Sequence, residues 1–216
     1  MLLEKLTVRY DRDETELIIN GENFIITIND MHSLSLSSNS EGTFLSEELY
    51  SNVLSLDEKL RCMKKALAAV ARTSSSRRQL FLKLKREFNA DAINACLDKL
   101  EKIGYLNDTE LAKRYAELYA KKRFGKTRIS TELFKKGFGR EDINTAIECL
   151  TLPEDEMFEN ISSLLEKKFR SKAFDKNKAY AYLRGMGYDS GEIKSALERI
   201  CEEMSDDSED LGSLID

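Results

Sequence analysis

The stretch that decides the fold, residues 98–138, reads DKLEKIGYLNDTELAKRYAELYAKKRFGKTRISTELFKKGF. Each of its three glycines follows a segment with a helical apolar pattern, and glycine is the residue that most readily adopts the left-handed backbone at a helix end. The stretch therefore predicts helices that end at Gly104, Gly125 and Gly137. Between Lys113 and Arg140 ten residues are basic and two are acidic, so the stretch is also strongly positive.

Apolar positions on both sides of this stretch recur with a step of 50 residues. Three sets of positions share the step: Ile93, Ile143 and Ile193; Leu97, Ile147 and Leu197; Leu100, Leu150 and Ile200. Such a fixed period is typical of tandem arrays in which each unit packs on its neighbours. We therefore predict a mostly α fold with three three-helix repeats, at 57–106, 107–152 and 153–204, that form an elongated curved body.

Local signals divide the first repeat into helices at about 57–72, 76–87 and 90–103. The last of these is expected to start behind the cap Asn89. Tyr105, directly after Gly104, is expected to pack back on that helix.

The N-terminal region, residues 1–56, follows a different pattern. Asn20-Gly21 stands between two apolar runs, and this pair favours a tight hairpin turn. We predict three strands, at about 5–10, 14–20 and 22–28, in a small antiparallel sheet. A short helix at about 46–54, capped by Ser46, is predicted to follow.

At the other end of the chain, residues 205–216 read SDDSEDLGSLID. Their acidic composition predicts a disordered tail.

Composition excludes several classes of function. The sequence has no run of about 18 apolar residues and no apolar signal segment at its start, so it predicts a cytoplasmic protein without membrane contact. It has one histidine and four cysteines without a CxxC pair, so no metal site is predicted. Glycine-rich phosphate loops and a nucleophile elbow are also missing from the sequence. We therefore predict a protein that is not an enzyme and needs no cofactor.

The net charge of −5 hides a strong asymmetry. Residues 1–58 hold 3 basic and 12 acidic residues, 59–201 hold 31 and 20, and 202–216 hold none and 7. In each repeat the basic residues fall on the first two helices, which predicts a positive stripe. A stripe of this kind suits a polyanion, meaning a phosphate backbone or an acidic protein groove, although Lys and Arg also simply solvate helices.

The basic residues of the first two repeats include the candidate contact residues for such a partner. This set comprises Arg77, Arg78, Lys83, Arg86, Lys121, Lys122, Arg123, Lys126, Arg128, Lys135 and Lys136. The interleaved aromatic residues Tyr115, Tyr119 and Phe124 either stack on nucleic-acid bases or belong to the core.

The motif from Gly104 to Gly137 resembles the RecX family, the regulatory proteins of the RecA recombinase. The resemblance rests on Gly104-Tyr105-Leu106-Asn107-Asp108, Leu111-Ala112, Gly125, Arg128-Ile129, Glu132-Leu133 and Lys136-Gly137. It implies tandem three-helix repeats and a regulatory role in DNA repair, DNA recombination and the SOS response. It further implies binding in the groove of the RecA–single-stranded DNA filament, with inhibition of RecA ATPase, strand exchange and coprotease activity.

We expect a monomer whose partners are the RecA filament and single- or double-stranded DNA. Two other hypotheses stay open. One is a sequence-nonspecific nucleic-acid-binding protein that acts independently of RecA, and the other is a protein scaffold that offers the hairpin edge to a partner.

Overall fold

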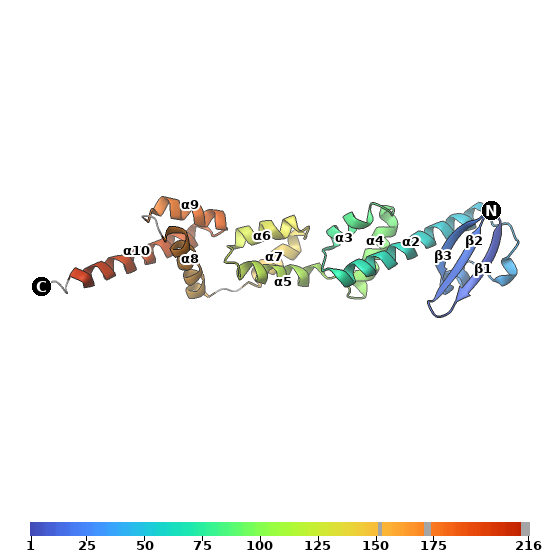
Figure 1. Ribbon diagram of the computed structural model, residues 1–216, viewed down its shortest axis with the longest axis horizontal. Helices are drawn as coiled ribbons and strands as arrows, with labels where there is room; N and C mark the ends of the chain where they lie inside the picture. The colour runs from blue at the N-terminus through green and yellow to red at the C-terminus, as the bar shows by residue number, and fades with distance from the viewer. Residues whose placement is uncertain (151–152, 171–173, 213–216) are drawn as a thin grey trace. The chain divides into compact units, whose positions relative to one another are not determined.

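The computed structural model describes residues 1–150, 153–170 and 174–212, with side chains described as far as residue 202 (Figure 1). These residues form a three-stranded antiparallel sheet followed by helices, so the predicted mostly α fold with a small N-terminal sheet is confirmed. The chain divides into two compact units, Met1–Asn107 (unit 1) and Asp108–Asp216 (unit 2). Among the described residues no helix is both long and apolar enough to span a bilayer.

The sheet of unit 1 has the strand order β1 (Leu3–Arg9), β2 (Glu14–Ile19) and β3 (Glu22–Thr27). Asn20 and Gly21 connect β2 to β3 with φ angles of 50° and 79°, which confirms the predicted hairpin turn. The inward side chains of the sheet form a hydrophobic cluster with the helices that follow it.

Two short elements follow the sheet, α1 (Ile28–Ser33) and the 3₁₀ helix η1 (Ser38–Ser40). The helix α1 was not predicted from the sequence. Its signal is present, since Thr27 and Asp30 form a capping box in which each side chain bonds the backbone N–H of the other residue.

The long helix α2 (Glu47–Arg72) joins the sheet to the later helices. The prediction of a short helix at about 46–54 separate from a second helix at about 57–72 is wrong. The helix continues because the residues between these ranges include neither glycine nor proline, and because Val53 and Asp57 are both buried in unit 1.

Asp57 attaches α2 to the edge strand β3. Its carboxylate accepts from the N–H of Ile25 at 2.6 Å and pairs with Arg61 at 2.8 Å. Arg61 in turn donates to the carbonyl oxygen of Asn23 at 2.8 Å. Side chains of α2 therefore cover this edge of the sheet.

The opposite edge, along β1, is also partly covered. The N–H of Leu3 donates to the carbonyl oxygen of Thr43 at 3.0 Å, and the N–H of Leu6 donates to the carboxylate of Glu41 at 2.7 Å. Because an added strand needs these backbone groups, the covered edges argue against the scaffold hypothesis at these positions.

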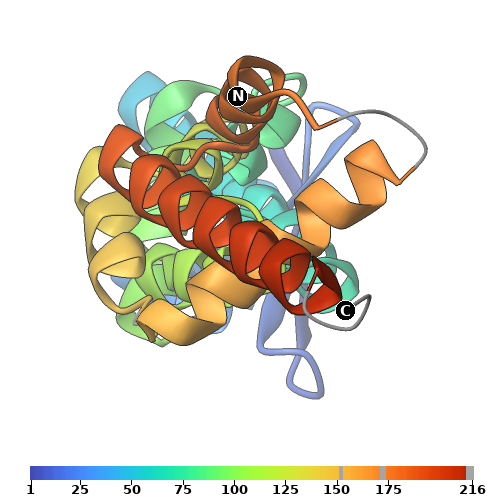
Figure 2. The same ribbon diagram turned by 90° about the vertical axis from the view of Figure 1, so that its left-hand side faces the viewer.

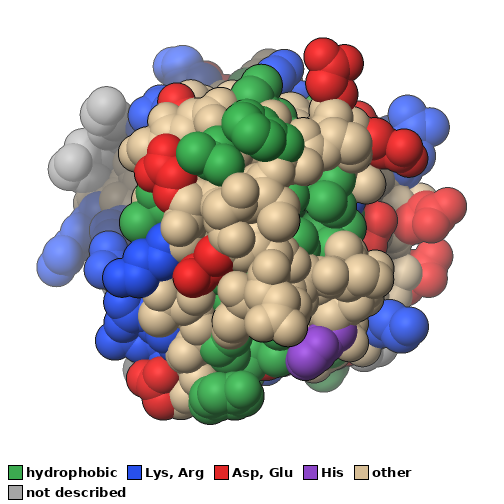
Figure 3. Space-filling model, turned by 90° about the vertical axis from the view of Figure 1, so that its right-hand side faces the viewer, with side chains coloured by type: hydrophobic (Ala, Val, Ile, Leu, Met, Phe, Trp, Pro, Cys, Tyr) green, Lys and Arg blue, Asp and Glu red, His purple; other side chains and the backbone are tan. Residues whose placement is uncertain are grey.

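Figure 3 shows a face of the molecule on which hydrophobic side chains appear in separate places among polar and charged ones. The single histidine, His32, is exposed on this face. This face therefore does not offer one continuous apolar patch of the kind that marks a large protein interface.

The end of α2 packs with α3 (Arg77–Leu84) and α4 (Ala90–Lys102), and we call this group module 1. From α2 the core takes Cys62 and Ala66, whereas Leu67 is 36% exposed.

Side-chain caps start these helices. The side chains of Ser46, Ser76 and Asn89 each accept from the backbone N–H three residues later, so the predicted caps at Ser46 and Asn89 are confirmed.

Gly104 ends α4 with φ +78°, and the N–H of Tyr105 donates to the carbonyl oxygen of Leu100 at 2.9 Å. The expectation that Tyr105 packs back on the helix is wrong. Its side chain is 60% exposed, and the apolar contact comes from the next residue, Leu106, which is 5% exposed.

Unit 2 contains six helices among its described residues. Module 2 comprises α5 (Asp108–Ala120), α6 (Lys126–Lys135) and α7 (Arg140–Glu148), and module 3 comprises α8 (Glu154–Phe169), α9 (Lys176–Met186) and α10 (Ser190–Gly212). Ile93, Ile143 and Ile193, which are 50 residues apart, are all buried in the third helix of their module. This is the pattern that a repeated three-helix unit predicts.

Figure 2 shows α10 as one unbroken helix. It continues to Gly212 and so runs into the stretch from residue 205 that was expected to be a disordered tail. The expectation of disorder therefore differs from the structure as far as Gly212, and residues 213–216 lie outside the described part of the chain.

Candidate binding surfaces and the joint between modules 2 and 3

The turn between α5 and α6 carries four basic residues in the sequence KKRFGK, residues 121–126. The prediction that a helix ends at Gly125 is wrong, because α5 ends at Ala120 and Gly125 is the N-cap of α6 with φ −73°. Arg123 closes α5 instead: it has φ +59°, and its N–H donates to the carbonyl oxygen of Ala120 at 2.7 Å. The left-handed conformation costs a residue with a side chain about 1–2 kcal/mol, so other contacts must stabilise the turn.

Those contacts come from module 3. The guanidinium of Arg123 donates to the hydroxyl of Ser163 at 2.6 Å, and its carbonyl oxygen accepts from the hydroxyl of Tyr188 at 3.1 Å. Arg123, a candidate contact residue, is therefore engaged inside unit 2.

Backbone groups of module 3 also cap the start of α6. Gly125 offers no side-chain cap, but its N–H donates to the carbonyl oxygen of Met186 at 2.9 Å. The N–H of Thr127 donates to the carbonyl oxygen of Gly187 at 3.1 Å. The unpaired donors at the start of α6 thus meet the unpaired acceptors at the end of α9, and each helix end satisfies the other.

The backbone segments around Gly125 and Gly187 approach so closely that only glycine fits at either position. A Cβ atom on Gly125 would lie 2.3 Å from the carbonyl carbon and oxygen of Gly187. A Cβ atom on Gly187 would lie 2.4 Å from the Cβ and backbone nitrogen of Arg128, and Gly187 also has φ +93°. We call this contact and its hydrogen bonds the module joint.

The three interleaved aromatic residues form a stack on module 2. The ring centroids of Tyr115 and Tyr119 are 6.4 Å apart, and those of Tyr119 and Phe124 are 5.9 Å apart. All three rings pack against the core cluster of the module and are half-buried. Of the two alternatives, the structure thus favours the core over stacking on bases.

Three candidate contact residues lie over these rings. The Nζ atoms of Lys122 and Lys136 are 5.6 Å and 4.2 Å from the ring centroids of Tyr119 and Tyr115. The guanidinium of Arg128 is 4.0 Å from the centroid of the third ring. These cations cover ring faces that a base would need.

In unit 1, Arg77 connects α3 to α4. It pairs with Asp98 at 2.6 Å and with Glu101 at 2.8 Å. Burial lowers the pKa of Arg77, but the two carboxylates outweigh burial, so its pKa is raised overall. Arg77 therefore holds module 1 together.

The remaining candidates differ in how far they are engaged. Lys135 pairs with Glu132 at 2.8 Å, and its ammonium lowers the pKa of that carboxyl group. The exposed candidates that pair with no carboxylate among the described residues are Arg78, Lys83 and Arg86 in unit 1 and Lys121, Lys122 and Lys126 in unit 2.

The contacts of Arg123 with Ser163 and with the hydroxyl of Tyr188 were not predicted from the sequence. The one feature of the sequence that pointed to this contact is Gly187, which lies 50 residues after Gly137. Nothing local in the sequence connects Arg123 to a residue 40 positions away.

Relatives of known family match most of this chain. A "Regulatory protein RecX" of Clostridioides difficile (strain 630) is 30% identical over 166 residues, which cover 74% of this chain and 77% of the relative. The chain belongs to the RecX family. A "Regulatory protein RecX" of Caldanaerobacter subterraneus subsp. tengcongensis is 27% identical over 199 residues, covering 91% of this chain and 98% of the relative.

Solved structures agree in fold. A crystal structure of regulatory protein RecX matches with a TM-score of 0.73 and 18% identity, over 91% of this chain and 98% of that one. The structure of RecX from Lactobacillus salivarius matches with a TM-score of 0.60 and 20% identity, over 66% and 96%. No family model matches the chain.

The module joint predicts a large effect of Gly187→Ala. The new Cβ would collide with Arg128, so we expect an overpacking loss of about 1–3 kcal/mol in the stability of unit 2, in addition to the left-handed strain. The matched control is Gly104→Ala, where φ is +78° but no atom lies within 4 Å of the new Cβ. Urea unfolding followed by amide NMR signals reports each unit separately, and equal losses in the two variants would contradict the close contact.

Tyr188 makes the joint sensitive to high pH. Burial, with a smaller contribution from Glu192, raises the pKa of Tyr188 to about 12 from an ordinary value of 10. The unfolded chain therefore loses this proton first as the pH rises, so the stability contributed by Tyr188 is complete below pH 10 and is lost between pH 10 and 12.

Tyr188→Phe removes both the titrating group and the hydrogen bond to Arg123. We expect the variant to be less stable than the parent by about 0.5–1.5 kcal/mol at pH 7. The difference should shrink as the pH rises above 10, as measured by urea unfolding at several pH values. A difference that stays constant across this range would show that the hydroxyl is not buried in the joint.

Proposed function

We propose that this protein regulates RecA by binding the RecA–single-stranded DNA filament, and that it inhibits RecA ATPase, strand exchange and coprotease activity in DNA repair. Membership in the RecX family supports a regulatory role. The turn between α5 and α6 supports a polyanionic partner, because Lys121, Lys122 and Lys126 are exposed there and residues 121–126 include no acid. The exposure of these three lysines on one turn is the main structural support for the proposal.

The backbone of the turn is fixed before binding. Arg123 is held by Ser163 and Tyr188, and Gly125 is held by Met186. A fixed backbone lowers the entropy that binding must remove, so three moderate charge contacts can act together.

The second exposed basic group, in unit 1, adds further contacts to the same proposal. It consists of Arg78, Lys83 and Arg86 on and just after α3. Several weak contacts on one chain raise the overall affinity when a long, periodic partner offers matching sites.

The candidate contact residues therefore divide into two roles. We propose direct contact for the six exposed cations, of which Lys122 also lies over the ring of Tyr119 at the longer distance of 5.6 Å. We propose a positioning role for the five that are engaged within the chain, Arg77, Arg123, Arg128, Lys135 and Lys136.

The test is the triple variant Lys121→Glu, Lys122→Glu and Lys126→Glu, which leaves Arg123 and the joint intact. We expect the concentration needed to inhibit RecA ATPase on single-stranded DNA to rise at least about tenfold, equivalent to 1.4 kcal/mol of binding free energy. The matched control reverses Lys5, Lys102 and Lys194, which are exposed outside the first two helices of the modules and give the same change in net charge. Full inhibition by the first variant, or an equal loss in both, would reject the role of the turn.

A nucleic-acid-binding protein that acts without RecA is the alternative. Because the aromatic rings face the core and are covered by cations, such a protein would hold phosphates rather than stack on bases. Its affinity for single-stranded DNA alone would fall steeply with salt. DNA affinity strong enough to account for the whole inhibition would favour this alternative.

A further inference from the structure

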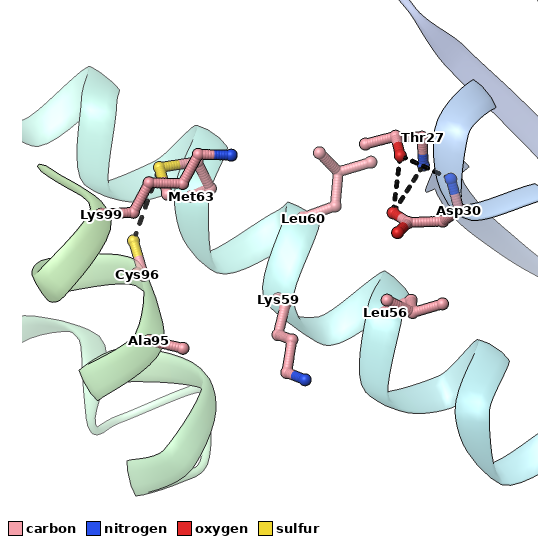
Figure 4. Close-up of a pocket in the computed structure, with 9 residues that line it drawn as sticks. All are labelled: Thr27, Asp30, Leu56, Lys59, Leu60, Met63, Ala95, Cys96 and Lys99. Carbon is pink, nitrogen blue, oxygen red and sulfur yellow. Dashed lines mark hydrogen bonds between the residues drawn. The ribbon is translucent and has the colours of Figure 1, made fainter. Parts of the chain in front are cut away.

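Unit 1 contains an apolar pocket of about 230 Å³ between α1, α2 and α4 (Figure 4). Five side chains from two helices supply its apolar lining: Leu56, Leu60 and Met63 from α2, and Ala95 and Cys96 from α4. No residue of the basic turn in unit 2 contributes to it.

Two lysines border the pocket, Lys59 from α2 and Lys99 from α4. Among the described residues no carboxylate forms an ion pair with either of them, and Lys59 begins a run of 28 residues without an acid. Asp30 also lines the pocket, but its carboxylate accepts from the hydroxyl of Thr27 at 2.6 Å, as Figure 4 shows. The pocket thus combines an apolar lining with two lysines that form no ion pair with a carboxylate of the described residues.

Module 3 has a pocket of about 200 Å³ at the corresponding place, between its first and third helices. The residues that the two pockets take from the third helix occupy equivalent positions, 100 residues apart, which is two repeats of 50. The pairs are Ala95 and Ser195, Cys96 and Ala196, and Lys99 and Arg199.

In module 3 the chain itself satisfies the cation. The guanidinium of Arg199 lies 3.9 Å from the ring centroid of Phe158 and 3.4 Å from the carboxylate of Asp155. Both partners come from α8, with the acid three residues before the ring.

Module 1 has the same spacing but not the same contacts. Leu60 stands in the place of Phe158, and Asp57 precedes it by three residues. Leu60 has no ring, and the carboxylate of Asp57 is turned to the sheet, where Ile25 and Arg61 engage it. The pocket of module 1 therefore has no counterpart of the contacts that Phe158 and Asp155 make with Arg199.

We propose that this pocket binds a segment of a partner protein that carries an aromatic or large aliphatic side chain three residues after a carboxylate. The apolar side chain fills the space over Leu60 and Met63, and the carboxylate pairs with Lys99, with Lys59 as a second cation. This site goes beyond the proposed function, since it is independent of the basic turn in unit 2.

The probe is a peptide with the sequence of residues 154–162, EDEMFENIS, blocked at both ends, because it carries the acid and ring that satisfy Arg199. Titrated into the ¹⁵N-labelled full chain, it is expected to shift amide signals of α1, α2 and α4 around the pocket. Lys99→Glu should weaken binding at least about tenfold, whereas Lys102→Glu, a matched reversal on the same helix outside the pocket, should not.

Two further variants test the apolar half of the site. A peptide with alanine in place of its phenylalanine should bind at least about tenfold more weakly, and Leu60→Phe in the protein should reduce binding because the new ring fills the space. Circular dichroism and the spectrum without peptide check that each variant is folded. The proposal is overturned if the peptide does not bind, if the shifts lie elsewhere, or if the two lysine reversals have equal effects.

Discussion

The backbone contact between Gly125 and Gly187 is the constraint on which the arrangement of unit 2 depends. Modules 1 and 3 start their second helices with a side-chain cap, Ser76 on α3 and Asp175 on α9. Module 2 instead has a glycine there, and the end of α9 supplies the missing acceptors. Replacing a side-chain cap by the backbone of the next module turns a local requirement of one helix into a contact between two modules.

The candidate binding surface follows from this contact. The joint holds Arg123 in a left-handed conformation, and this conformation determines where the chain places the lysines on either side. The positive charge of the turn and its fixed shape therefore have different sources. The lysines supply the charge, and the third module supplies the shape.

Much of the fold could be predicted from local rules, because Asn20-Gly21, Gly104 and Gly137 adopt left-handed backbone conformations that few residues favour. The wrong predictions concern features that tertiary contacts determine, namely the length of α2 and the residue that packs back on α4. The buried carboxylate of Asp57 helps α2 continue past the expected break, and Leu106 rather than Tyr105 packs back because only one of the two faces the core. The candidate site was predicted by charge alone, and charge does not tell an exposed lysine from a cation such as Arg77 that pairs within its own module.

Amide hydrogen exchange at Gly125 and Thr127 shows directly whether the end of α9 caps the start of α6. Donors in the first turn of a helix normally exchange quickly because nothing in the helix accepts their hydrogen bonds. If α9 caps α6, both amides should be protected to about the same degree as the interior of α6. Fast exchange at these two amides, with the interior of α6 still protected, would contradict the joint and the fixed shape of the basic turn.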